Sequence, residues 1–403
     1  MGETIRPISK SERIEVLDVI RGFAIFGILM ANIQSWSGYK FMPFEVMQRL
    51  SYYEFNDILH HLFMIFIDTK FYTLFSLLFG IGFYIQFRKF RDEQTEFIKT
   101  YRRRLAFLML FGAIHAFFWS GDILLIYGLV GFFFILFRNL PPKRLLLVAV
   151  FFYYVWVVKD IVIFNFFPDF IQHYQATSYK TYVDLSPEAL MLRFQSGTFF
   201  EVLHANWHNL YWRYVDLFPA GRLSIVLALF LFGYYLMMIG YFQKWAKSKR
   251  LMLLFWIGGL FFTMLADQIG GSMSKFATEW MGVLYKIVAI TGQILLTMAY
   301  VNTLTILYEK IPWRTMLHPL SYVGRMSFSN YIMHTLFGYL IFYPFFGQLF
   351  GKMSLVEILV LSIVLYTFQI GISWLWLKYF RFGPLEWLWR CLTYGKWFPL
   401  RRE

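Results

Sequence analysis

Two ionisable residues, His115 and Asp122, lie in the apolar interior of residues 102–138, a stretch that begins with three arginines and ends at Arg138. This stretch has the apolar content of two short transmembrane helices joined by a turn. An ionisable side chain at membrane depth is costly unless it faces protein or water, so by default it marks a functional site such as a proton relay or a substrate path. The simpler interpretation is that His115 hydrogen-bonds a neighbouring helix and that Asp122 caps the second helix. That interpretation gives no reason for the two to cluster with Trp119 at one depth.

The first apolar segment carries a second candidate group, Asp18, Arg21 and Asn32. Asp18 and Arg21 are three residues apart, close enough to pair on a helix. Asn32 follows Arg21 by almost three whole turns, so both point the same way about 16 Å apart along the axis. Arg21 could neutralise a phosphate near one membrane face, and Asn32 could orient a carbonyl or an amine near the other. The alternative is an arginine that reaches the interface, with Asn32 hydrogen-bonding a neighbouring helix.

The second apolar segment begins with Asp57, His60 and His61 and places Lys70 near mid-depth. A lysine there requires a partner such as Asp68, a helix end or an anionic ligand. The adjacent histidines point in different directions on a helix, so at most one of them shares a face with Asp57. We therefore include Lys70 among the candidates for ligand binding and the other three among the candidates for lining a cavity.

A later segment contains Arg325 at the predicted cytoplasmic edge, with Asn330 and His334 deeper in the membrane. Asn330 and His334 are one turn apart on one face, so they either line a cavity together or hydrogen-bond a neighbouring helix. We expect no metal site. His204 and His208 have helical spacing, but the pattern HANWH lacks the glutamate of the zinc motif HExxH.

Composition determines the broad class. The 403 residues are 59% hydrophobic, 22% aromatic and 15% charged, which is typical of a multi-pass membrane protein rather than a soluble enzyme. The net charge of +14 does not indicate a nucleic-acid partner, because the basic residues flank apolar segments. The single cysteine, Cys391, excludes an intramolecular disulfide and a thiol cluster for a metal. The first apolar run carries charges and lacks a cleavage site, so we expect no cleavable signal peptide.

Length and apolarity predict an all-α protein with about ten transmembrane helices in contact with the lipid bilayer. An irregularity is expected at Asp68-Thr69-Lys70, and a short helix is expected at Leu185–Gln195, after Ser186-Pro187. The predicted spans are Val16–Ser35, Ile58–Phe87, Leu105–Trp119, Asp122–Phe137, Leu145–Phe167, Pro219–Phe242, Leu251–Ile269, Met281–Tyr308, Tyr322–Phe346 and Leu355–Leu377. The predicted organisation is a cytoplasmic N-terminus (1–15), an N-terminal membrane half with the candidate site (16–167), an external cap (168–218), a C-terminal membrane half (219–378) and a basic cytoplasmic tail (379–403).

Lysine and arginine predict the orientation. With both termini in the cytoplasm, the cytoplasmic segments hold 26 of the 38 basic residues and the external segments hold 7. This asymmetry is what the positive-inside rule predicts. An odd number of spans would place a strongly basic segment outside.

Five ordered motifs carry a resemblance to a known family: LDVIRGFAIFGILMAN, KFYTLFSLLFGIGF, GAIHAFFWSGDILLIYGLVG, GRMSFSNYIMHT and FGPLEWLWRCLTYGK. In order and spacing they resemble the YeiB-like family of bacterial membrane proteins, which implies a location in the bacterial inner membrane. The resemblance covers most of the chain except the external cap and parts of spans five to eight. That family in turn looks related to transmembrane acyltransferases, namely the acyltransferase-3 proteins and heparan-alpha-glucosaminide N-acetyltransferase, and so implies a bundle of that kind.

This relationship implies transfer of an acyl group from cytoplasmic acyl-CoA to an unidentified acceptor at the outer face. Arg21 and Asn32 match the pair in the first helix of those enzymes. The catalytic histidine of the heparan enzyme has no counterpart, because residues 34–57 contain no histidine. His115 is the substitute we favour, with Asp122 holding its tautomer and charge and Asn32 stabilising the oxyanion. Arg21, Lys70 and Arg325 would hold the donor.

Two other functions use the same residues. A transporter or exporter of a small or amphipathic solute would use them as a solute path with alternating access. A membrane scaffold without catalytic activity explains the cap but not Lys70. The sequence does not identify the acceptor or the oligomeric state, although a homodimer is one possible assembly.

Overall fold

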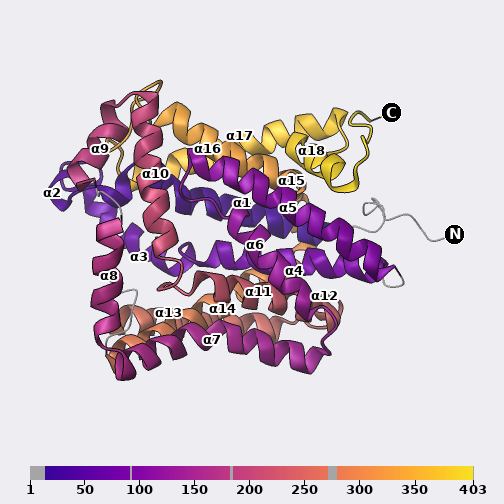
Figure 1. Cartoon of the computed structure of the whole chain (residues 1–403). Helices are drawn as coiled ribbons and strands as arrows, with labels where there is room; N and C mark the ends of the chain where they lie inside the picture. Colours follow the sequence, from indigo (N-terminus) through magenta and orange to yellow (C-terminus); the bar gives the residue numbers. More distant parts are fainter. Residues whose placement is uncertain (1–13, 91–92, 182–184, 271–278, 403) are drawn as a thin grey trace.

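The chain is all-helical in the computed structural model, which describes residues 14–90, 93–181, 185–270 and 279–402 (Figure 1). Within these ranges the sole β-type feature is an isolated antiparallel bridge between Phe380 and Arg401. The predicted all-α class is therefore confirmed.

The helices, with η marking short 3₁₀ turns, have the following bounds: α1 Glu15–Trp36, η2 Tyr39–Phe41, α2 Phe44–Met47, η3 Tyr53–Phe55, α3 Asn56–Phe66, α4 Lys70–Lys89, α5 Gln94–Phe118, α6 Leu124–Phe134, η4 Ile135–Phe137, α7 Pro142–Phe166, α8 Asp169–Thr181, α9 Pro187–Ser196, α10 Phe199–Val215, α11 Arg222–Met238, α12 Tyr241–Lys244, α13 Lys249–Ile269, α14 Trp280–Tyr308, α15 Ile311–Arg325, α16 Ser327–Ile341, α17 Leu355–Tyr379 and α18 Pro384–Tyr394.

Several of these helices can cross a membrane. In the described ranges, six helical segments are long and apolar enough: Glu15–Trp36, Tyr53–Lys89, Pro142–Phe166, Lys249–Ile269, Trp280–Tyr308 and Leu355–Tyr379. Two shorter apolar helices are Leu124–Phe137 and Arg222–Met238. These segments make the chain a membrane protein, whereas the total of ten spans remains a prediction.

The predicted irregularity at residues 68–70 is confirmed. Helix α3 ends at Phe66, α4 begins at Lys70, and Thr69 between them has a φ of +69°. A β-branched residue rarely adopts this left-handed conformation, so the surrounding packing must hold it. A second interruption separates α15 from α16 at Met326.

Helices from the two predicted membrane halves pack against one another. A Cβ atom on Gly22 would come within 2.0 Å of a backbone oxygen of α15, and one on Gly324 within 1.8 Å of a backbone oxygen of α1. The absence of side chains at both positions lets the two backbones touch, as is common where membrane helices cross. Arg21 and Arg325 each adjoin one of these glycines, so this crossing brings the two arginines together.

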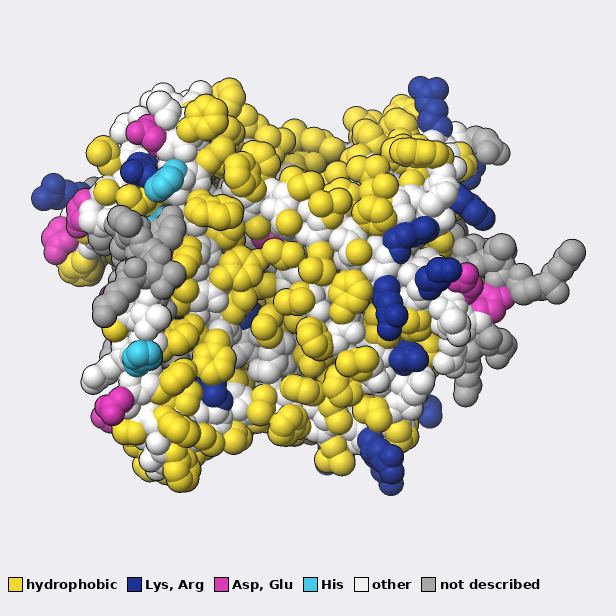
Figure 2. All heavy atoms as spheres, in the orientation of Figure 1, with side chains coloured by type: hydrophobic (Ala, Val, Ile, Leu, Met, Phe, Trp, Pro, Cys, Tyr) yellow, Lys and Arg dark blue, Asp and Glu magenta, His cyan; other side chains and the backbone are white. Residues whose placement is uncertain are grey.

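The two ends of the bundle differ in charge. Helix α1 begins at the end where α12 and α18 lie, and α2, α8 and α9 lie at the opposite end (Figure 1). On the face in Figure 2, lysine and arginine side chains gather at the first of these ends, while apolar side chains cover the middle. We refer to these as the basic end and the cap end. The middle region provides the apolar belt that a bilayer requires.

The predicted external cap is formed at this end by three helices, α8 to α10. The predicted short helix at Leu185–Gln195 is found as α9, and the Ser186 side chain caps it by accepting a hydrogen bond from Ala189 N at 3.1 Å. Helix α10 begins with a capping box formed by Thr198 and Glu201. Its residues then run inward and reach the end of α5.

Candidate functional site

His115 lies at the centre of a buried chain of hydrogen bonds. Its Nδ1 atom is 2.7 Å from Asp122 Oδ1, and its Nε2 atom is 2.8 Å from Thr335 Oγ1. The three residues are only 5%, 3% and 6% exposed. With Asp122 Oδ1 as the acceptor, His115 Nδ1 donates this hydrogen bond, and Nε2 is the ring nitrogen that accepts a hydrogen bond from the Thr335 hydroxyl. We call these three residues the triad.

Helix ends and one asparagine position the triad. His115 lies in the last turn of α5, and Asp122 lies in the turn between α5 and α6. The side chain of Asn206, on α10, accepts from Ser120 N at 2.6 Å and donates to the carbonyls of Ala116 and Phe117. The cap therefore satisfies backbone groups that the end of α5 leaves unpaired, and it fixes the turn that carries Asp122.

Asp122 has two roles, one for each carboxylate oxygen. Oδ2 accepts a hydrogen bond from Leu125 N at 2.8 Å, which is the capping role that the simpler interpretation expected. Oδ1 faces His115. Helix capping thus accounts for the contact of Oδ2 but not for the contact between Oδ1 and the imidazole.

Aromatic rings surround the triad. The Tyr331 ring centre is 5.2 Å from that of His115, and the Tyr331 hydroxyl accepts from Ile123 N at 3.2 Å. The Trp119 ring centre lies 5.7 Å from His115 and 4.6 Å from Trp36. The buried Nε1 of Trp36 has no hydrogen-bond partner within the described part of the chain. The surroundings exclude water from the imidazole and leave one indole donor unused.

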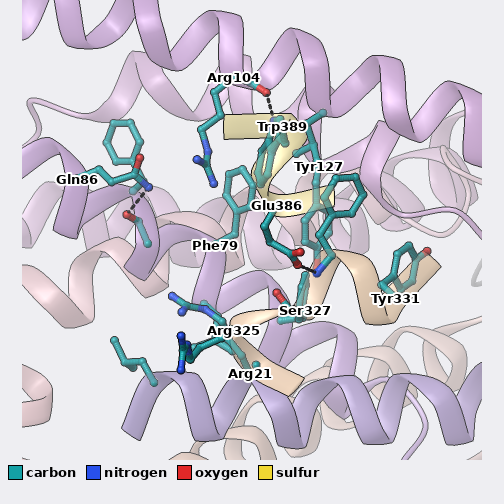
Figure 3. Close-up of a pocket in the computed structure, with 18 of the residues that line it drawn as sticks. Arg21, Phe79, Gln86, Arg104, Tyr127, Arg325, Ser327, Tyr331, Glu386 and Trp389 are labelled. Atoms are coloured by element: carbon teal, nitrogen blue, oxygen red, sulfur yellow. Dashed lines mark hydrogen bonds between the residues drawn. The ribbon is translucent and has the colours of Figure 1, made fainter. Parts of the chain in front are cut away.

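A cavity of about 270 Å³ reaches from the basic end to this aromatic layer (Figure 3). Its walls come from α1, α4, α5, α6, α15, α16 and α18 and are largely apolar. Figure 3 places Gln86 at one side of the cavity and Tyr331 at the other. Ile123, adjacent to Asp122, and Tyr331, one turn before Thr335, both line it. The cavity therefore ends beside the triad.

The polar lining of the cavity carries a surplus of positive charge. Four arginines and two acids contribute to it: Arg21, Arg104, Arg325, Arg390, Asp18 and Glu386. Arg21 Nη1 pairs with Asp18 Oδ1 at 2.6 Å, as the spacing predicted. Figure 3 shows the guanidinium group of Arg104 on one side of the space and those of Arg21 and Arg325 on the other. Such a set can hold phosphate groups of an anionic ligand.

Helix α18 closes the basic end of the cavity. The Arg104 guanidinium stacks on the Trp389 ring at 3.8 Å from its centre, and Trp389 Nε1 donates to Arg104 O at 2.9 Å. Glu386 accepts hydrogen bonds from Phe328 N at 2.7 Å, Ser329 N at 3.0 Å and Ser329 Oγ at 2.5 Å. Burial raises the pKa of Glu386, although these hydrogen bonds oppose the shift. A carboxylate at the start of α16 is favourable for its helix dipole and fixes α18 to that helix.

Three other candidate residues lie outside the cavity wall. Lys70 Nζ donates to Met64 O at 2.5 Å, so the end of α3 supplies its partner. His334 Nε2 is 3.1 Å from Gln369 Oε1, and Asn330 Nδ2 donates to Ser373 Oγ at 3.0 Å. The last two contacts join α16 to α17, which favours the alternative of hydrogen bonding between helices.

The remaining candidates lie nearer the cap end. His61 Nδ1 is 3.5 Å from Asp267 Oδ2, and the His60 ring packs beside that of His61. Asp57 lies in the first turn of α3. Asn32 is half-buried on α1. None of the four contributes to the cavity wall, and the hydrogen bonds of the triad do not include Asn32.

Two arginines that the sequence analysis did not identify lie on the cap side of the triad. Arg213 Nη2 donates to the Asp122 carbonyl oxygen at 3.2 Å. The Arg222 guanidinium lies 4.9 Å from the Tyr72 ring centre. Burial and the nearby charge of Arg222 lower the pKa of Arg213 to about 10, so Arg213 remains cationic at neutral pH. The triad thus has arginines on both sides.

The histidines considered for zinc have other partners. His208 Nε2 accepts from Leu185 N and from Trp212 Nε1, each at 3.1 Å. His204 Nδ1 is 2.5 Å from Arg193 Nη1. In the described part of the chain, no group of three or more His, Cys, Asp or Glu side chains has a geometry that could hold a metal ion.

The chain is similar to several bacterial proteins over almost its whole length. Uncharacterized protein YxaH of Bacillus subtilis (strain 168) is 31% identical over 99% of both chains. Uncharacterized protein YeiB of Escherichia coli (strain K12) is 28% identical, over 95% of this chain and 96% of that protein. An uncharacterized 39.9 kDa protein of Bacillus acidopullulyticus is 27% identical, over 98% of this chain and 97% of that protein. Residues 223–396 match DUF418, a family of proteins of unknown function, and no solved structure matches.

Proposed function

The chain belongs to the YeiB-like family of bacterial membrane proteins, and from this premise we propose that it is an acyltransferase. In this proposal, acyl-CoA enters from the basic end and its acyl group passes to an acceptor at the cap end. The observation that carries the proposal is the cavity, which joins a cluster of arginines to the end wall beside the His115 triad. The proposed relationship to transmembrane acyltransferases rests on the motifs and on this chemistry.

The cavity suits the two parts of an acyl-CoA. Arg21, Arg104 and Arg325 offer positive charge for the phosphates of CoA. The remainder of the wall, including Phe75, Leu78 and Phe79, suits pantetheine and a hydrophobic acyl chain. A donor bound with its phosphates at the basic end would direct its thioester toward Tyr331.

His115 is the proposed general base. Asp122 orients the imidazole so that Nε2 is unprotonated, which is the state that a base requires. On the cap side, Arg213 and Arg222 are placed to hold an acceptor that bears a phosphate or carboxylate group. Asn32, which the resemblance implied as the group that stabilises the oxyanion, lies on the outer part of α1 outside the cavity wall, so no catalytic role is included for it here.

The proposal includes a topology. The basic end is the cytoplasmic side of the bacterial inner membrane, both termini lie there, and about ten helices cross the bilayer in an acyltransferase-like bundle. The gathering of lysine and arginine at the end that holds α18 supports this orientation. It places the acyl-CoA site where acyl-CoA is made and the cap outside the cell.

A transporter is the second candidate, and the broken helices favour it. Helices α3 and α4 meet at a left-handed residue, and α15 and α16 meet at Met326. Discontinuous helices are common at the binding sites of transporters. A transporter would move its solute unchanged, whereas the acyltransferase would release free CoA.

The test is donor binding by purified protein in lipid nanodiscs, followed by native mass spectrometry and by thermal shift. We expect acetyl-CoA or palmitoyl-CoA to bind saturably, and dephospho-CoA, which lacks the 3′-phosphate, to bind more weakly. Arg104→Ala should weaken binding by about tenfold, because a hydrogen bond to a charged group contributes about 1.5–3 kcal/mol. Arg49→Ala, at the exposed cap end, is the matched control. Equal binding by both variants, or no binding at millimolar CoA, would contradict the proposal.

A further inference from the structure

We propose that Thr335 is the nucleophile of this enzyme and carries the acyl group as an ester between the two half-reactions. This inference rests on the proposed function and extends it to a covalent intermediate. Thr335 Oγ1, His115 Nε2, His115 Nδ1 and Asp122 Oδ1 form one chain with contacts of 2.8 Å and 2.7 Å. A hydroxyl within hydrogen-bond reach of a base, with that base oriented by a third group, is the geometric signature of nucleophilic catalysis.

The hydrogen bond of Thr335 departs from the local preference of a helical threonine. Such a residue readily donates to the carbonyl four positions earlier. Thr73, Thr305 and Thr367 all do so in this chain, at 2.7 to 2.8 Å. Thr335 lies within α16, and its hydroxyl is instead hydrogen-bonded to an imidazole 220 positions earlier in the sequence. A threonine that served only to stabilise α16 could donate to its own helix backbone and would not need a hydrogen bond to His115 or the support of Asp122.

The position of Thr335 suits an acyl group that arrives through the cavity. Tyr331, at the cavity's end, precedes Thr335 by four residues, or about 6 Å along the helix. The Trp36 ring packs against Gly338, three residues beyond Thr335, and its Nε1 donor is buried without a partner in the described residues. This indole N–H is the available donor for the oxygen of a bound acyl group. The cavity thus brings the thioester to one side of the triad, with an unused donor nearby.

The two half-reactions balance. As Thr335 Oγ bonds to the thioester carbonyl carbon, its proton passes to His115 Nε2. The C–S bond then breaks, and the imidazolium returns the proton to the leaving sulfur, which releases CoA as a thiol. In the second half, an acceptor hydroxyl or amine attacks the ester and its proton passes to His115. The C–Oγ bond breaks and Thr335 regains a proton, so one acyl group has moved from sulfur to the acceptor.

A covalent intermediate would also separate the two substrates in space. The donor cavity opens from the basic end, and Arg213 and Arg222 lie on the other side of Asp122. With the acyl group on Thr335, CoA can leave toward the basic end before the acceptor reaches the ester from the cap end. Donor and acceptor then never need to meet across the buried layer.

The experiment uses the full-length protein in nanodiscs and two probes. The first is acetyl-CoA without an added acceptor, with thiol release measured over time and the intact protein mass measured after rapid acid quenching. The second is a fluorophosphonate, which forms an O–P bond to an activated hydroxyl with loss of fluoride and needs no acyl-CoA. We expect a burst of about one thiol per protein, one added acetyl group, and both modifications on Thr335. Thr335→Ser should retain both, and Thr335→Val should lose both.

Thr305→Val is the matched control, because Thr305 is also buried and its hydroxyl donates to a backbone carbonyl. It should fold and react like the unmodified protein. The inference is overturned if CoA binds but Thr335→Val still gives the burst and the acetylated protein. Fluorophosphonate labelling of Thr335 without any CoA binding would instead support the triad and refute acyl-CoA as the donor. Absence of both reactions in folded protein that binds acetyl-CoA would refute the covalent intermediate alone, whereas absence of acetyl-CoA binding as well would also refute the proposed function.

Discussion

Replacing Asp122 by asparagine tests the role of the triad with a minimal change in shape. Both carboxylate oxygens accept hydrogen bonds, from His115 Nδ1 and from Leu125 N. Asparagine keeps one acceptor and presents an NH₂ group in place of the other. If its oxygen continues to cap α6, its NH₂ group faces Nδ1, which must then accept. The proton moves to Nε2, and His115 can no longer take a proton from Thr335.

The magnitude follows from the loss of the base. General-base catalysis contributes about 10²–10⁴-fold, which corresponds to about 3–5 kcal/mol of transition-state stabilisation. We therefore expect Asp122→Asn to slow thiol release from acetyl-CoA by roughly that factor, with a shifted pH profile. A minor population with the original tautomer should keep its rate above that of His115→Ala. The fold should lose only about 1–2 kcal/mol, because one hydrogen bond is impaired and the cap is retained.

Asp160→Asn is the control for this prediction. Asp160 is as buried as Asp122, but its carboxylate pairs with Lys286 Nζ at 2.5 Å and Lys159 Nζ at 2.7 Å. Its replacement leaves buried cations without a charge partner, so it should lower the melting temperature strongly and leave the rate of folded protein unchanged. If both variants instead lost rate and melting temperature in proportion, the triad would have no special role. Unchanged turnover in Asp122→Asn would refute the tautomer argument directly.

Three further predictions concern the ends of the cavity and the topology. Arg213→Ala should raise the KM for the acceptor by about tenfold and leave the burst of CoA thiol release unchanged. An equal effect on both half-reactions would contradict its proposed position on the acceptor side. Burial raises the pKa of Glu386, so ionising it costs folding stability as the pH rises above its pKa in the unfolded chain, about 4.3. Glu386→Gln should therefore reduce the decline of the melting temperature above that pH. An unaltered pH dependence would show that this carboxyl makes no such contribution. In a Cys391→Ser background, an impermeant thiol reagent should label Glu188→Cys in whole cells but label Lys247→Cys only after lysis. The opposite pattern would show that the proposed orientation in the membrane is inverted.

Much of the architecture follows from local sequence. Apolar length and aromatic content are sufficient for the helical class, because a membrane span must satisfy its backbone within one helix. The break at residues 68–70 and the short helix α9 were also predictable, since a buried lysine beside Asp68 and a Ser-Pro start are local signals. His115 and Asp122 are seven residues apart, and this short separation allowed their pairing to be anticipated.

The residues that the sequence analysis missed are joined by long-range contacts. Thr335 is 220 positions from His115, and Glu386 is 57 positions from Ser329. A threonine in a membrane helix is too common to indicate a site, because most of them bond their own backbone. Lys70 illustrates the converse case. The sequence correctly predicted that a buried lysine there requires a partner. Whether that partner is a ligand or a helix end depends on how α3 and α4 meet, which local sequence does not determine.

Two of the buried ionisable networks in the described part of the chain differ in a way that bears on function. Asp160 forms ion pairs with Lys159 and Lys286, and such a network can serve packing alone. The triad joins a hydroxyl, an imidazole and a carboxylate in that order. If these residues served packing alone, apolar side chains of similar volume would fill the same space without the cost of burying polar groups. The cavity ends beside this second network, at Tyr331 and Ile123. The order of the groups and the adjoining cavity together favour chemistry at His115 over a role in packing alone.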